Sequence, residues 1–385
     1  MIDSIQIQPA SLKDREELLK LYFLTYGRDY PLAYGTDSQK MTEAIGSEEY
    51  EWLTARDLKN DSIIGSIVFE LDRLNKVGKA AALVVHPDYR KAGIGSQLLA
   101  RGNALIGSDG FLNSIYTTTR TQNIGPQLIC LREGYLPLGI FPNAHKLKTY
   151  ETTTLMVKFK EGALEKRISI EKIPQKLIPL YEVVRERLPE INLPKCAEMS
   201  NGISGRLPRK EVSFEAIFAP NYVLRRFRSD VMDPQNQFYP FHSPNLLLAE
   251  ENGNIEVFAF FNKSDGYCTL ISFNPPIYEL EDVIPALLDK LHGLGVSYVE
   301  VLVGTDRIQS IEVLLRSQFL PSALYPAMRE VKGRTYDFVV MTRTMEPLNF
   351  RGMQIEQAFK PYIDQYVNLW KSMYLETLEV FRDYE

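Results

Sequence analysis

The segment best suited to chemistry is Arg90-Lys91-Ala92-Gly93-Ile94-Gly95, which lies between a strand-like run ending at Val85 and a helical pattern that begins near Ser96. The first N–H groups of a helix lack partners inside the helix, and the helix dipole places positive charge there. Two glycines, two cations and the Ser96 hydroxyl therefore predict a socket for a phosphate group at this helix start.

Three phosphate-binding patterns could contain this loop. The nucleotide-hydrolase loop needs Gly-Lys-Ser/Thr, whereas Gly95 is followed by Ser96-Gln97. The nicotinamide-dinucleotide fingerprint needs a glycine directly after the strand, whereas seven residues separate Val85 from Gly93, and Leu98 stands where a third small residue belongs. Both of these patterns fit poorly.

The third pattern fits. Val-His-Pro-Asp-Tyr followed by Arg-x-x-Gly-x-Gly and an amphipathic helix resembles the acetyl-coenzyme A pyrophosphate loop of the GNAT acyltransferase superfamily. The later segment from Asn123 to Gly134-Tyr135 is similar to the strand, Asn, short helix and Gly-aromatic pair of that family. The resemblance covers about residues 1–160 by motif and residues 165–345 by element order alone.

This resemblance implies acetyl-coenzyme A as the cofactor. The amides of residues 91–96 would take the pyrophosphate, the backbone at Val84-Val85 would pair with the pantetheine arm, and Asn123 would hydrogen-bond that arm or the incoming amine. A turn-forming role before a helix is the alternative for Asn123. The implied cofactor-binding residues are Val84, Val85, Arg90, Lys91, Ala92, Gly93, Ile94, Gly95, Ser96 and Asn123.

The implied reaction transfers an acyl group from a thioester to an amine, which needs a proton acceptor, an oxyanion donor and an acid for the thiolate. The sequence departs from the family pattern here: the strand before the loop carries no carboxylate, and the usual tyrosine acid, seven residues after Asn123, is Cys130. The candidates are therefore Asn123, Cys130 as a weak acid and Glu151 as a base, with Glu70 as a second base. Core packing for Cys130 and solvation for the carboxylates are the alternatives.

Three tyrosines, Tyr26, Tyr30 and Tyr34, follow the first predicted helix, where GNAT proteins form the wall of their substrate pocket. They predict a pocket for a small-molecule amine, and packing at the helix end is the alternative.

Composition predicts a folded chain, because 45% of the 385 residues are hydrophobic and 24% are charged. The length favours two domains. The net charge of -5 gives no field that would attract nucleic acid or an anionic membrane, and we expect a cytoplasmic protein because no signal or membrane-spanning run is evident. Cys130, Cys196 and Cys268 match no zinc spacing, so no metal is expected.

The order of elements predicts an α/β fold with a mixed sheet. Residues 1–160 are expected to form a GNAT domain, and residues 165–350 a second, degenerate GNAT-like domain. The repeat rests on the strands starting at Ser114 and Ser297, 183 residues apart, and at Thr152 and Tyr336, 184 apart. A chance succession of common elements is the alternative.

The second domain is not expected to bind coenzyme A, because Glu279, Glu281 and Asp282 replace the basic glycine loop and would repel a pyrophosphate. Residues 351–385 are predicted as an amphipathic helix that docks on its own chain or on a second subunit of a homodimer. Its apolar stripe is Tyr362, Tyr366, Trp370, Tyr374, Leu378 and Phe381.

The sequence therefore predicts an acetyl-coenzyme A-dependent N-acetyltransferase that acts on a small-molecule amine. A non-catalytic acyl-coenzyme A sensor or interaction module on the same fold is the alternative, because the usual carboxylate and tyrosine are missing.

Overall fold

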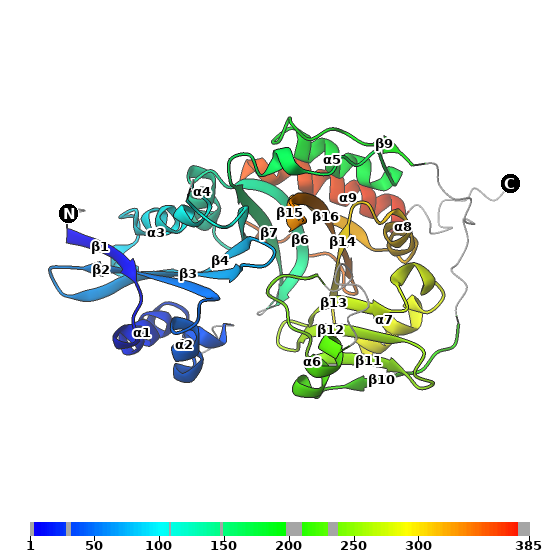
Figure 1. The fold of residues 1–385 in the computed structure, drawn as a ribbon, viewed down its shortest axis with the longest axis horizontal. Helices are drawn as coiled ribbons and strands as arrows, with labels where there is room; N and C mark the ends of the chain where they lie inside the picture. The colour runs from blue at the N-terminus through cyan, green and yellow to red at the C-terminus, as the bar shows by residue number, and fades with distance from the viewer. Residues whose placement is uncertain are drawn as a thin grey trace.

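The computed structural model describes residues 4–27, 32–107, 109–146, 149–197, 210–229 and 238–375. Across these residues a mixed sheet of 14 strands runs along the molecule, with helices on both faces (Figure 1). The strand order is β1-β2-β3-β4-β5-β7-β6-β15-β16-β14-β13-β12-β11-β10. This architecture confirms the predicted α/β fold with a mixed sheet.

The first half of the sheet is sandwiched between two helix pairs, α1 with α2 on one face and α3 with α4 on the other (Figure 1). Val68 packs toward α1, whereas Ile67 and Phe69 pack toward α3, as the alternation of a strand requires. The elements are β1 (Ile5–Pro9), α1 (Arg15–Tyr26), α2 (Ser38–Ile45), β2 (Tyr50–Asp57), β3 (Ser62–Asp72), β4 (Val77–Val85), η5 (Pro87–Tyr89), α3 (Ile94–Gly102), β5 (Ser114–Arg120), α4 (Gly125–Arg132), β6 (Leu136–Lys146) and β7 (Tyr150–Phe159).

The rest of the chain forms the second half of the sheet and the segments that join and cover it. The joining segment holds β8 (Lys172–Ile173), α5 (Ile178–Arg185) and β9 (Lys195–Cys196). The second half holds β10 (Phe214–Ile217), α6 (Pro220–Ser229), β11 (Leu246–Glu250), β12 (Glu256–Asn262), β13 (Tyr267–Asn274), η10 (Ile277–Glu279), α7 (Ile284–Gly293), β14 (Tyr298–Gly304), α8 (Ile308–Arg316), β15 (Leu320–Val331) and β16 (Arg334–Thr344), followed by α9 (Lys360–Tyr374).

The strand order reads the same from both ends of the sheet. From the edge inward the first half runs 1-2-3-4-5-7-6 and the second half 10-11-12-13-14-16-15. The parallel pairs, β4 with β5 and β13 with β14, occupy matching places. The starts of β6 and β15, and of β7 and β16, are 184 residues apart, and those of η5 and η10, and of α3 and α7, are 190 apart. The two halves therefore share one topology.

The halves meet where β6 approaches β15, and this contact depends on a glycine. Gly139 pairs with Ala323, and a Cβ atom on Gly139 would lie 2.5 Å from the Ala323 Cα and 2.6 Å from the Ser322 carbonyl oxygen. Any side chain at position 139 would therefore force the strands apart.

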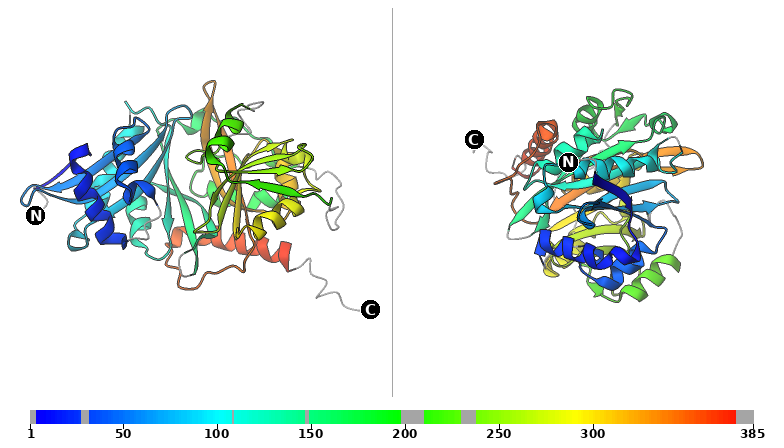
Figure 2. Two further views of the ribbon diagram at one scale, coloured as in Figure 1. Left: turned by 90° about the horizontal axis from the view of Figure 1, so that it is seen from below. Right: turned by 90° about the vertical axis from the view of Figure 1, so that its left-hand side faces the viewer.

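Helix α9 covers this junction and docks on its own chain (Figure 2). The Tyr362 hydroxyl donates to the Pro137 carbonyl in β6 (2.6 Å), and the Tyr374 hydroxyl donates to the Gln318 carbonyl beside β15 (2.7 Å). The prediction placed the start of this helix at residue 351, whereas the helix begins at Lys360, where Pro361 suits the first helical turn. The predicted stripe residues Leu378 and Phe381 lie outside the described residues.

Some local elements were not predicted from the sequence. Strands β1, β6 and β15 were not predicted, because β6 and β15 each contain two prolines and β1 is short. Around the first helix Leu18 and Tyr22 are buried, whereas Leu12 and Phe23 are more than half exposed. Helix α1 begins at Arg15, so Leu12 lies outside it.

Candidate active site

The loop between η5 and α3 presents unpaired backbone donors. Helix α3 begins at Ile94, and the Gln97 N–H donates to the Gly93 carbonyl (3.1 Å). Within the described part of the chain, no protein acceptor is assigned to the N–H groups of residues 93–96. Four backbone donors at a helix start are therefore available to an anion.

The backbone of this loop is shaped to hold such an anion. Lys91 and Gly93 both have positive φ, +68° and +75°, which makes a concave nest of N–H groups. A Cβ atom on Gly93 would meet nothing within 4 Å, so the space above the loop is open. Arg90 and Lys91 are exposed beside it. The geometry fits the pyrophosphate of a nucleotide cofactor.

Strands β4 and β5 leave backbone groups unpaired next to this loop. They pair in parallel at Val77–Ser114, Gly78–Ile115 and Lys79–Tyr116. Both strands continue beyond that point, but residues 80–85 of β4 and residues 117–120 of β5 do not pair with each other. Their facing backbone edges can accept an extended, amide-bearing ligand.

A bulge in β4 fixes the shape of this unpaired stretch. Ala82 has a φ of +53°, and two hydroxyls from α1 hold the carbonyls there: Tyr22 donates to Ala82 and Tyr26 to Leu83, both at 2.9 Å. Tyr26, predicted to line an acceptor pocket, therefore also secures the strand. Tyr30 lies outside the described residues.

The three predicted catalytic residues lie in different surroundings. The Asn123 side chain accepts the Gly125 N–H (2.8 Å), as expected of a turn-forming residue before α4. Cys130 is 5% exposed in the core, and burial raises its thiol pKa to about 12, which favours packing over acid chemistry. Glu151 accepts two hydrogen bonds from the Arg120 guanidinium, at 3.0 and 2.9 Å, so its charge is compensated.

A different carboxylate lies at the point where β4 and β5 stop pairing. Glu70 in β3 is the cross-strand neighbour of Lys79 in β4, and its Oε2 is 4.0 Å from the Lys79 Nζ. The Tyr34 hydroxyl donates to Glu70 Oε1 at 3.3 Å. Glu70 and Tyr34 were both candidate site residues from the sequence, but their proximity to Lys79 was not predicted. Counting outward from the β3–β4 turn, where Asp72 faces Val77, would have paired Glu70 with Lys79.

The matching loop of the second half has the opposite character. Counting by the 190-residue offset, Leu280, Glu281, Asp282 and Val283 replace Arg90, Lys91, Ala92 and Gly93. The N–H groups of Val283 and Ile284 both donate to the Leu280 carbonyl, at 2.9 and 3.0 Å. Glu281 accepts from the Arg316 guanidinium at 2.8 Å. This loop offers carboxylates and paired amides where the first offers cations and open amides.

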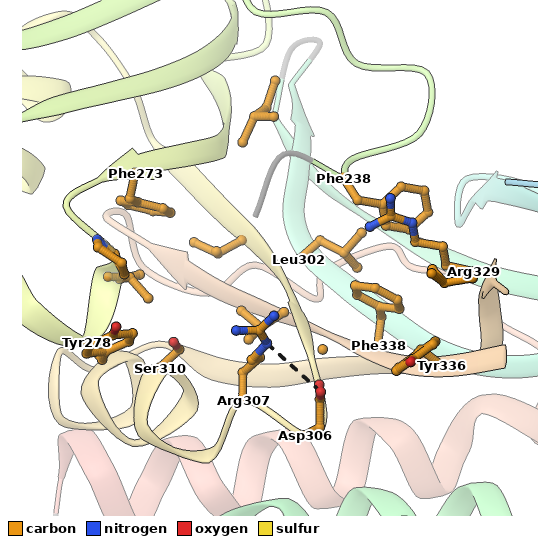
Figure 3. Close-up of a pocket in the computed structure, with 17 residues that line it drawn as sticks. Phe238, Phe273, Tyr278, Leu302, Asp306, Arg307, Ser310, Arg329, Tyr336 and Phe338 are labelled. Carbon is orange, nitrogen blue, oxygen red and sulfur yellow. Dashed lines mark ion pairs between the residues drawn. The ribbon is translucent and has the colours of Figure 1, made fainter. Parts of the chain in front are cut away.

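The crevice between β13 and β14 is narrow. It holds a cavity of about 80 Å³, whereas pockets for small ligands typically measure about 300–1,000 Å³. Figure 3 shows Phe273, Leu302 and Phe338 around this space, with Arg307 and Asp306 paired at one end (3.9 Å). Nothing in this lining reproduces the nest of the first half.

Other kinds of site find no support among the residues that the structure describes. No group of three or more His, Cys, Asp or Glu side chains there could hold a metal ion. No helix in the same ranges is long and apolar enough to cross a membrane.

Comparisons with known proteins found one family match and similar solved structures. Residues 15–125 match a sequence model of the acetyltransferase (GNAT) family, and no curated protein matches the chain. An acetyltransferase of the GNAT family from Streptococcus pneumoniae is 22% identical with a TM-score of 0.34, over 40% of this chain and 99% of its own. The structure of yncA from Salmonella typhimurium with its cofactor acetyl-CoA is 16% identical with a TM-score of 0.35, over 41% and 94%.

Spermidine N-acetyltransferase from Vibrio cholerae, in complex with CoA and spermine, is 12% identical with a TM-score of 0.36, over 41% of this chain and 96% of its own. The family match includes β4, the nest and the start of α4, the elements that build the site described above. Residues 15–125 of this chain form a domain of the acetyltransferase (GNAT) family.

Proposed function

We propose that the first half of the chain binds acetyl-coenzyme A and transfers its acetyl group to the amine of a small molecule. The observation that carries this proposal is the set of four unpaired N–H groups at residues 93–96, in an open nest at the start of α3 inside a GNAT domain. When bound, the cofactor supplies an acetyl thioester.

The proposed residue roles follow the geometry. The nest of residues 91–96 and the Arg90 and Lys91 side chains hold the pyrophosphate. The backbone of β4 at residues 80–85, with Val84 and Val85 at its end, pairs with the pantetheine arm. Asn123 lies just past the end of β5, the strand that borders the unpaired stretch opposite β4. Tyr22 and Tyr26 keep the bulge of β4 in shape for that pairing.

We also infer the domain organisation. The shared strand order supports a GNAT domain at residues 1–160 and a degenerate GNAT-like domain at residues 165–350, with residues 351–385 as a covering segment. The carboxylates and paired amides of the second loop support a second domain that does not bind coenzyme A.

The test uses the full chain. Acetyl-coenzyme A at about a hundred times its dissociation constant should stabilise the protein by about 2.7 kcal/mol, which a thermal melt would detect. Release of free thiol in the presence of amines should then report transfer. Stabilisation without thiol release from any amine would favour the acyl-coenzyme A sensor, and no stabilisation of folded protein would reject both readings.

A further inference from the structure

Strand β4 carries no carboxylate, but Glu70 lies on the neighbouring strand β3. Pairing between β4 and β5 ends at Lys79 and Tyr116, so this position is the closed end of the unpaired stretch. Glu70 stands one strand further, in register with Lys79. A row of three polar side chains, from Glu70 through Lys79 to Tyr116, therefore crosses three strands at the place where a cofactor arm running back from the nest would end.

Glu70 is both held and accessible. Its Oε1 accepts from the Tyr34 hydroxyl at 3.3 Å, and its Oε2 faces the Lys79 Nζ at 4.0 Å. Its side chain is 14% exposed and that of Lys79 is 20% exposed, so a small solute can reach both. An ionised carboxylate has about four lone-pair sites, which leaves Glu70 able to accept a further proton or hydrogen bond.

Glu151 is less suited to accept a proton. Two guanidinium hydrogen bonds from Arg120 and a further bond from Gln122 occupy its oxygens, and the side chain is 6% exposed. Protonating Glu151 would break this charge-assisted arrangement, which costs free energy. Glu70 has no such bidentate partner among the described residues.

A segment of the second half, at Phe241 and His242, lies beside the row of Glu70, Lys79 and Tyr116. The Phe241 ring lies 6.0 Å from the Tyr116 ring. The pKa of His242 is lowered to about 3, mainly by burial and also by the positive charge of Lys79, which therefore lies nearby. A loop of the second half therefore forms a wall beside the Glu70–Lys79 row. The combination of a carboxylate and aromatic rings suits an ammonium group on an apolar body.

We propose that Glu70 is the proton acceptor for acetyl transfer to a small primary alkylammonium acceptor, with Lys79 and Tyr34 as its positioning residues. This inference rests on the proposed acetyl transfer. The acceptor ammonium gives one proton to the Glu70 carboxylate, and its freed lone pair forms the bond to the acetyl carbon. The carbon–sulfur bond breaks, the second amine proton passes to the departing thiolate, and Glu70 releases its proton to solvent.

The experiment compares two classes of nucleophile in the full chain carrying Glu70→Gln. Putrescine and 2-phenylethylamine are protonated at neutral pH and need a proton acceptor, whereas hydroxylamine is already unprotonated. Since a positioned base contributes typically 10²–10⁴-fold, we expect Glu70→Gln to lower alkylamine turnover at least about 100-fold and hydroxylamine turnover only a few-fold. Calorimetric affinity for acetyl-coenzyme A should stay within about twofold of the unmodified chain, since Glu70 lies away from the nest.

The matched control is Glu43→Gln, which removes another lysine-paired carboxylate, 3.0 Å from Lys40 on the surface of α2. It should leave both turnover rates and the affinity unchanged. Retained alkylamine turnover in Glu70→Gln, or equal losses for both nucleophile classes, would overturn the role of Glu70 and leave the acetyl transfer intact. Transfer to hydroxylamine but to neither alkylamine in the unmodified chain would overturn the acceptor class. Absence of acetyl-coenzyme A binding by the unmodified chain would instead overturn the proposed function.

Discussion

The loop of residues 90–93 and the loop of residues 280–283 occupy matching places in the two halves, so charges of the second loop can be introduced into the first. This substitution tests the proposed anion site directly. In the second half Glu281 and Asp282 stand where Lys91 and Ala92 stand in the first. Lys91→Glu combined with Ala92→Asp gives these two positions the charges that they have in the second loop, a change of three units. Both positions are exposed, so the fold should tolerate the exchange.

The magnitude follows from Coulomb's law with screening. A unit charge about 6 Å from a phosphate contributes about 1.4 kcal/mol at an effective dielectric constant of about 40, so three units amount to about 4 kcal/mol. Screening at physiological salt removes roughly half of this, which leaves about 2 kcal/mol, or a loss in affinity of about 30-fold. The neutral pair Lys91→Met with Ala92→Asn loses one unit and should weaken binding only about threefold.

Isothermal titration of the full chain with acetyl-coenzyme A is the assay. The unmodified protein should bind one equivalent, because the amides of Val283 and Ile284 are already paired. Equal affinities for the charged and the neutral variants would refute the electrostatic reasoning. A stoichiometry of two, with one site insensitive to the transplant, would refute the assignment of the second half as a non-binding copy.

Two further predictions concern buried groups. In the folded protein at about pH 8, iodoacetamide should modify exposed Cys196 quickly and spare Cys130 and Cys268, whose thiol pKa values burial raises; fast labelling of all three, read by mass spectrometry, would contradict the packing. His242 has its pKa lowered to about 3 by burial, so it stabilises the fold fully above its unfolded pKa of about 6.5 and loses that contribution as the pH falls toward 3. At pH 5 the loss is about 2 kcal/mol, and denaturant titrations should show that His242→Gln removes this part of the acid dependence; an unchanged dependence would show that His242 is not the responsible group.

The local parts of the site could be predicted from the sequence. Two glycines and two cations before Ser96 fix the nest through backbone conformation and the unpaired amides of one helix start, and these are properties of consecutive residues. The carboxylates at Glu279, Glu281 and Asp282 likewise mark the second loop as unsuited to an anion without any tertiary information.

The surroundings of the candidate catalytic residues were harder to predict, because they come from distant segments. Cys130 was predicted by its spacing from Asn123, yet packing of α4 in the core buries its thiol. Glu151 was a plain carboxylate in sequence, and only the register of β5 against β7 brings the Arg120 guanidinium to it.

The sequence by itself determined the α/β pattern, the nest of unpaired amides at the start of α3 and the contrast in charge between the two loops, because short-range periodicity and backbone freedom decide such features. Only the tertiary structure decided that Arg120 in β5 meets Glu151 in β7, that Phe241 from the second half packs on Tyr116, and that β6 and β15 join the halves in one sheet. Strand register and the packing of segments more than a hundred residues apart depend on the whole core, and no local pattern encodes them.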